Sequence, residues 1–107
     1  SATSATWREN LESYLCFRRS LKGVILLMDI RHTLKDSDKT MITWLCSIDL
    51  PIHVLLTKSD KLSKSSRSSE LTRVKRDLGD KINCQLFSSK SQEGLKNLEQ
   101  ALAHWLN

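Results

Sequence analysis

Three short runs of apolar and β-branched residues stand out along the chain. They cover residues 23–29, 52–57 and 82–87, and the last run is the weakest. The first two runs are continuous rather than alternating, which is typical of strands buried on both faces of a parallel sheet. We therefore predict three parallel strands at these positions.

Apolar residues at helical spacing separate and flank the three runs. Four helices are expected, with these positions near their ends: Trp7, an N-cap at Asp36 or Ser37, a stop at Gly79, and a start just after Gly94. The serine-rich stretch 59–69 is expected to be a mobile connector before the third helix. The order α-β-α-β-α-β-α predicts an α/β fold, a parallel sheet with helices on both faces and right-handed crossovers.

Length and composition indicate one domain or a part of one. The chain has 107 residues, 39% of them apolar, with one proline and three glycines. The glycine spacing excludes a P-loop and a G-x-G-x-x-G dinucleotide loop within these residues. Seven basic and two acidic side chains lie between Lys58 and Arg76 and account for the formal net charge of +5. Such a basic stretch suits an anionic partner, RNA or nucleotide phosphates.

The cysteines and the hydropathy pattern bear on where in the cell the protein is expected to lie. Cys16, Cys46 and Cys84 are far apart and lack the spacing of a zinc site or a disulfide framework. We expect them to be small buried residues of a cytoplasmic protein. No apolar run approaches the length of a membrane span, so we expect no membrane partner.

The residues that follow the second predicted strand have a pattern suited to guanine. Ligands of open α/β sheets bind at the carboxyl ends of the strands. Thr57-Lys58-Ser59-Asp60 has the form [N/T]-K-x-D. The Asp60 carboxylate can accept hydrogen bonds from both N1–H and the 2-amino group of guanine, a pair of donors that adenine lacks. Lys58 is expected to cover the base with its methylene stem, and Thr57 to brace the loop.

The loop after the third predicted strand should lie beside the first. It reads Phe87-Ser88-Ser89-Lys90. We expect the backbone N–H groups of Ser88 and Ser89 to bind the guanine O6 atom and Lys90 to close over the opposite face of the ring. Ser88 and Ser89 are also candidates for the N-cap of the final helix.

Four segments together resemble the EngB (YihA/YsxC) GTP-binding proteins of the TRAFAC class. They are 21–32 (LKGVILLMDIRH), 34–38 (LKDSD), 55–61 (LLTKSDK) and 87–89 (FSS). The resemblance implies a Ras-like P-loop NTPase fold that binds GTP or GDP together with Mg²⁺. It also implies a role in assembly of the large ribosomal subunit, with that subunit or its rRNA as partner, and a requirement for normal cell division and septation.

The chain departs from this family at several points. Thr33 stands where the family usually has proline, which we expect to loosen the turn, and Ser59 replaces a common alanine. The family's P-loop, Mg²⁺-binding residues and D-x-x-G switch precede the matching region and are absent from these residues. Residues 1–107 are therefore expected to be the C-terminal half of a G domain. They carry no catalytic or metal-binding residue, GTP hydrolysis is expected only of the complete protein, and the first strand has an edge open to self-association.

Two alternatives remain open. Asp29, Thr57 and Lys90 follow successive strands, as the phosphoacceptor, Thr/Ser and Lys of receiver domains do, although we prefer Asp29 as an anchor for the Arg31–Leu34 turn. The other alternative is a basic RNA- or ribosome-binding module without nucleotide binding, which would use these six residues: Lys61, Lys64, Arg67, Arg73, Lys75 and Arg76.

Overall fold

The structure, a computed structural model, describes residues 22–106. The predicted helix near Trp7 and the thiol of Cys16 lie outside this range. The elements in chain order are β1 (Val24–Asp29), α2 (Asp36–Ser47), β2 (Ile52–Thr57), the 3₁₀ turn η1 (Ser59–Lys61), α3 (Lys64–Leu78), β3 (Asn83–Leu86) and α4 (Leu95–Leu106). All three predicted strands are confirmed.

The three strands form a parallel sheet in the order β1-β2-β3. Val24 pairs with Ile52 at one end of the β1–β2 ladder, and Leu56 pairs with Leu86 near the end of the β2–β3 ladder. The central strand β2 is buried from Ile52 to Leu56. That burial on both faces explains why its apolar run is continuous rather than alternating.

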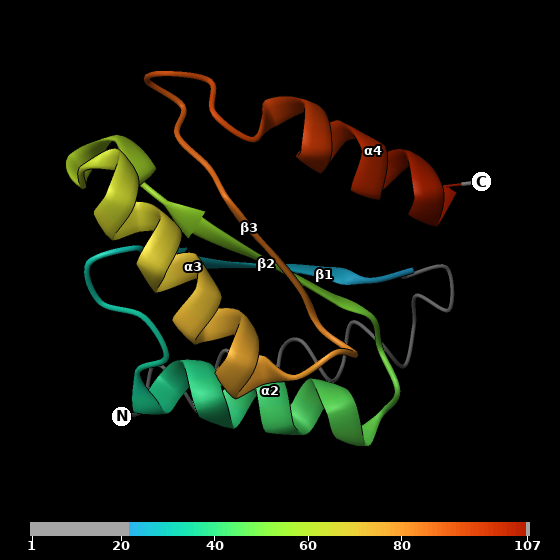
Figure 1. Ribbon diagram of the computed structural model, residues 1–107. Helices are drawn as coiled ribbons and strands as arrows, with labels where there is room; N and C mark the ends of the chain where they lie inside the picture. The colour runs from blue at the N-terminus through green and yellow to red at the C-terminus, as the bar shows by residue number, and fades with distance from the viewer. Residues whose placement is uncertain (1–21, 107) are drawn as a thin grey trace.

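Helices cover both faces of the sheet, as predicted (Figure 1). On one face α2 and α3 enclose the main core, in which Leu45, Val54 and Val74 are completely buried. Helix α4 lies on the other face. Its Trp105 ring packs edge-on against the His53 ring, with the two ring centroids 6.4 Å apart. Hydrophobic burial on these two faces is what holds the layers together.

The serine-rich stretch is mostly helical, so the expected mobile connector is wrong. Helix α3 begins at Lys64, because the hydroxyl of Ser63 accepts a hydrogen bond of 3.2 Å from the Ser66 N–H and caps the first turn. The serines that follow are exposed and cost the helix little. The expected N-cap of α2 at Asp36 or Ser37 is wrong as well. Lys35 is the N-cap residue, and its N–H donates to the Asp38 carboxylate.

The two described cysteines differ from each other. Cys84 lies in the core, where burial raises the pKa of its thiol to about 11. Cys46 is exposed on α2, so the expectation that both are buried is wrong for this residue. The difference follows from the faces they occupy, since Cys84 points from β3 toward the core cluster and Cys46 lies on the exposed side of its helix.

Gly94, just before α4, has a backbone that an L-residue would strain. Its φ is +80°, and a Cβ atom there would overlap the Leu86 carbonyl oxygen. We expect Gly94→Ala to lower the free energy of unfolding by roughly 2 kcal/mol or more. Gly79→Ala is the matched control, since Gly79 also has positive φ but open space around it, and should cost only about 1 kcal/mol. Urea denaturation measures both, and equal losses would contradict the steric argument.

Candidate functional site

The carboxyl ends of β2 and β3 continue side by side into their loops, at one end of the sheet (Figure 1). The Phe87 N–H donates to the Leu56 carbonyl at 2.9 Å, and the Ser59 N–H donates to the Phe87 carbonyl at 3.1 Å. Both bonds prolong the β2–β3 ladder past the strands. The two loops predicted to lie together are therefore held together by backbone hydrogen bonds.

A side-chain hydrogen bond joins the two loops at the predicted acid. The Ser88 hydroxyl donates to Asp60 Oδ1 at 2.7 Å. Ser88 is completely buried, whereas Asp60 is half-buried. This hydrogen bond, supported by the nearby charges of Lys61 and Lys90, lowers the pKa of Asp60 below its ordinary value. Asp60 is thus an ionised, acceptor-only group at neutral pH, with lone pairs to spare.

Thr57 and Lys58 set the path of the first loop. The Thr57 hydroxyl donates to the Met28 carbonyl at 3.2 Å, which is the bracing contact expected of it. Lys58 adopts a left-handed backbone with φ 58° and ψ 36°, and this turns the chain from β2 into η1. Its side chain is exposed, with Nζ 3.7 Å from Asp29 Oδ2.

Asp29, at the end of β1, is the turn anchor that the sequence favours. Its Oδ1 accepts from Arg31 N and Nε at 2.9 and 3.0 Å, and its Oδ2 accepts from an Arg31 terminal nitrogen at 2.8 Å. These bonds hold the pKa of Asp29 well below its usual range. Arg31 thus engages both oxygens of Asp29 and ties the carboxylate to its own turn.

Thr33 fastens its turn rather than loosening it, contrary to expectation. Its hydroxyl donates to Glu70 Oε2 at 2.9 Å and accepts from Arg73 at 2.6 Å. Glu70 and Arg73 also form a salt bridge of 2.8 Å along α3. The hydroxyl that distinguishes Thr33 from proline therefore joins the β1–α2 loop to α3.

The second loop differs from the prediction at Ser88. Its N–H donates to the Glu93 carbonyl at 3.0 Å, so it is not available to a base carbonyl. Its hydroxyl accepts from the Ser91 N–H at 3.1 Å. That contact closes a local turn and does not cap α4, which starts only at Leu95, so the expected N-cap role is also wrong. Ser89 and Lys90 are exposed beside it.

Glu93 is a structural residue that sequence reasoning missed. Its Oε1 accepts from the Ser59 hydroxyl at 2.6 Å and lies 3.3 Å from Arg67 Nε. Ser59 is completely buried, and its hydroxyl, which stands where the resemblance predicts an alanine, adds a part-buried hydrogen bond. The one available sequence signal was an acidic residue directly before a turn glycine, in a strand-to-helix loop.

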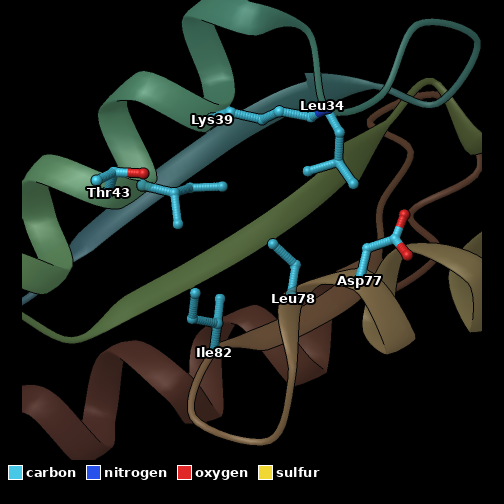
Figure 2. Close-up of a pocket in the computed structure, with 7 residues that line it drawn as sticks. Leu34, Lys39, Thr43, Asp77, Leu78 and Ile82 are labelled. Carbon is cyan, nitrogen blue, oxygen red and sulfur yellow. The ribbon is translucent and has the colours of Figure 1, made fainter.

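A groove lies elsewhere on the molecule and is drawn in Figure 2. It has a volume of about 450 Å³ and runs between α2 and the C-terminal end of α3. Its lining residues are Leu34, Lys39, Ile42, Thr43, Asp77, Leu78 and Ile82. None of the eight predicted site residues contributes to it.

The basic stretch is partly used within the fold. Arg67 donates to the Leu62 carbonyl at 3.0 Å and pairs with Glu93, and Arg73 pairs with Glu70 and Asp77. The remaining basic residues of the proposed RNA module are exposed: Lys61, Lys64, Lys75 and Arg76. Two of the six side chains assigned to that module are therefore engaged in internal contacts.

Neither a metal-binding cluster nor a membrane-spanning helix is found in the described part of the chain. Within residues 22–106, no group of three His, Cys, Asp or Glu side chains is arranged to hold a metal ion. In the same range, none of the helices combines the length and apolar character needed to cross a bilayer.

Comparison with known proteins identifies relatives along nearly the whole chain. Proteins named probable GTP-binding protein EngB from Coxiella burnetii (strain RSA 493 / Nine Mile phase I) and Aeromonas salmonicida (strain A449) are 45% and 44% identical over 102 residues, 92% of this chain. The one from Azoarcus sp. (strain BH72) is 44% identical over 104 residues, 94% of this chain. The chain is similar to these EngB proteins along 92% to 94% of its length. It spans about half the length of these relatives, 50%, 47% and 50% respectively.

Solved structures support the fold described above. Translation elongation factor SelB from Methanococcus maripaludis, in complex with the GTP analogue GppNHp, matches with a TM-score of 0.66 at 20% identity. The match covers 82% of this chain and 21% of that one. The apo form matches with a TM-score of 0.65. The predicted partial Ras-like α/β fold is confirmed, whereas no protein-family model matches the chain.

The low pKa of Asp29 predicts how stability depends on pH. Because folding lowers this pKa, the ionised carboxylate stabilises the fold above the ordinary aspartate value of about 3.9. That contribution is lost as the pH falls from there through the folded-state pKa. We expect the urea midpoint of unfolding to be lower for Asp29→Asn than for the wild type at pH 5–7. The difference between the two midpoints should narrow below about pH 4.

Asp80→Asn is the matched control, since Asp80 is exposed and makes no hydrogen bond or salt bridge with any residue in the described part of the chain. A difference between Asp29→Asn and the wild type that stays constant down to pH 2 would contradict the Arg31–Asp29 argument.

Proposed function

We propose that this chain is the guanine-reading part of a GTP-binding domain and that Asp60 selects the base. The observation that carries the proposal is the 2.7 Å hydrogen bond between Ser88 and Asp60, which puts an ionised carboxylate beside the loop after the next strand. Both loops lie at the carboxyl ends of parallel strands, where ligands of such sheets bind. The EngB homologues named as GTP-binding proteins support the same function.

Each predicted residue has a role in this proposal. Asp60 accepts hydrogen bonds from N1–H and the 2-amino group of guanine. The Ser89 N–H donates to the guanine O6 atom, since the Ser88 N–H already donates to the Glu93 carbonyl. Lys58 and Lys90 cover the two faces of the base with their exposed side chains. Thr57, Ser59, Phe87 and Ser88 hold the two loops in place through the hydrogen bonds described above.

We also propose that residues 1–107 form the C-terminal half of an EngB-type G domain. Strand β1 is an edge of the described sheet, and its Leu27 side chain is 62% exposed. An apolar edge of this kind suits a further strand and helix on that side. In the complete domain, other residues would contact the phosphates and Mg²⁺ and support hydrolysis of GTP.

The EngB resemblance also supports a proposal for the role of the complete protein. We propose that it takes part in assembly of the large ribosomal subunit in the cytoplasm, by contact with that subunit or its rRNA, and that normal cell division and septation need it. The exposed Lys61, Lys64, Lys75 and Arg76 supply positive charge for such a contact.

Exchange of the selecting acid tests the proposal in the full-length protein. Asp60→Asn replaces one acceptor oxygen by an amide donor, which suits xanthine, whose C2 carries an oxygen. We expect the GDP-to-XDP affinity ratio to fall on the order of 10²-fold, because a buried donor then faces a donor. Competition titrations with a fluorescent nucleotide measure this ratio.

Asp77→Asn, on the exposed side of α3, is the control and should leave the ratio unchanged. An unchanged ratio in Asp60→Asn would refute the role of Asp60. Salt-dependent RNA binding that survives Asp60→Ala, in a protein without guanine preference, would instead favour the basic module.

The open edge of β1 generates a separate prediction for the isolated 107-residue chain. We expect it to form dimers or larger species through this strand. Leu27→Lys should raise the monomer fraction, because a charge on an exposed edge strand opposes pairing. Ile48→Lys is the control, since Ile48 is 42% exposed at the end of α2. Gel filtration with light scattering measures the mass, and a folded wild-type monomer would contradict the prediction.

A further inference from the structure

Glu93 connects the first loop, helix α3 and the second loop. Its carboxylate accepts from the Ser59 hydroxyl at 2.6 Å in the first loop and pairs with Arg67 of α3 at 3.3 Å. Its backbone carbonyl accepts from the Ser88 N–H at 3.0 Å in the second loop. One residue therefore holds both loops that meet at the Asp60–Ser88 hydrogen bond.

Glu93 contacts residues that adjoin the side chains proposed to bind the guanine base. Ser59 lies between Lys58 and Asp60 and is completely buried, so a shift of Ser59 moves both neighbours. Ser88 is also completely buried and supplies the hydroxyl bound to Asp60. The distance between the Asp60 carboxylate and the Ser88–Ser89 backbone therefore depends on Glu93 through two separate contacts.

Glu93 is itself held on both sides. The following residue, Gly94, has its carbonyl bound by Gln85 Nε2 at 2.8 Å, and Gln85 Oε1 lies 2.6 Å from His53 Nε2. Arg67, which pairs with the Glu93 carboxylate, also donates a hydrogen bond to the Leu62 carbonyl. Both the backbone and the carboxylate of Glu93 are thus fixed to the sheet and to α3, which makes it a rigid connection rather than a surface acid.

We propose that Glu93 is a positioning residue for guanine recognition. By setting the separation of the two loops, it holds the Asp60 carboxylate and the Ser89 N–H at the spacing of one purine edge. This inference rests on the proposed function. It differs from it in that Glu93 touches no nucleotide and acts only through Ser59 and Ser88.

The test compares substitutions at both ends of the contact in the full-length protein. Glu93→Ala removes both side-chain contacts, and Ser59→Ala removes only the hydrogen bond. Glu93→Gln keeps an acceptor for Ser59 but loses the charge that pairs with Arg67. Glu99→Ala, on the exposed face of α4, is the control. The readouts are the GDP and ADP dissociation constants, the thermal midpoint, and amide hydrogen exchange in residues 58–61 and 88–91.

We expect Glu93→Ala to lower the preference for GDP over ADP about tenfold or more, with faster exchange in both loops. Glu93→Gln and Ser59→Ala should give smaller losses in the same direction, and Glu99→Ala none. A residue that only stabilises the fold would lower the thermal midpoint and leave the GDP-to-ADP ratio unchanged.

The possible failures are distinguishable. Unchanged GDP preference in folded Glu93→Ala, alongside its loss in Asp60→Ala, overturns the role of Glu93 and leaves the proposed function standing. If Glu93→Ala does not fold, Ser59→Ala and Glu93→Gln decide by the same ratio. A wild-type protein with no preference for GDP over ADP overturns the proposed function and the positioning role together.

Discussion

The parallel pairing of β2 with β3 does not stop where the strands end, and the candidate site depends on this. Two more backbone hydrogen bonds, Phe87 N to Leu56 O and Ser59 N to Phe87 O, carry the ladder into the loops. They place Asp60 within reach of the Ser88 hydroxyl. Without that pairing, an acid and a serine 28 positions apart in the chain would have no reason to meet.

The burial of β2 makes that pairing rigid. Its residues from Ile52 to Leu56 are all buried between α2 and α3 on one face and α4 on the other. A shift of one residue would exchange the side chains of its two faces and disrupt the packing on both. The hydrophobic layers therefore fix the register, and the register fixes which loop residues face one another.

Charged side chains secure the same end of the sheet. Asp29 binds Arg31 and lies beside Lys58, and Thr33 joins its loop to Glu70 and Arg73. Glu93 joins α3 to the loops that follow β2 and β3. Most of these groups are partly exposed, where single ion pairs contribute little to stability. Their effect is geometric, since each fixes one loop relative to a helix or a neighbouring strand.

Local pattern was enough to locate the strands, the order of the elements and the Thr57–Asp60 and Phe87–Lys90 loops, because burial on one or two faces leaves a periodic trace in the sequence. One local signal was misread, because the serine-rich stretch was expected to be a mobile connector. Ser63 is instead the N-cap of α3, which begins at Lys64. The engagement of the Ser88 N–H, the hydroxyl contacts of Thr33 and the connections of Glu93 were decided by the tertiary structure alone. Their partners lie 5 to 40 positions away, and such contacts depend on how loops are brought together rather than on any repeat in the chain.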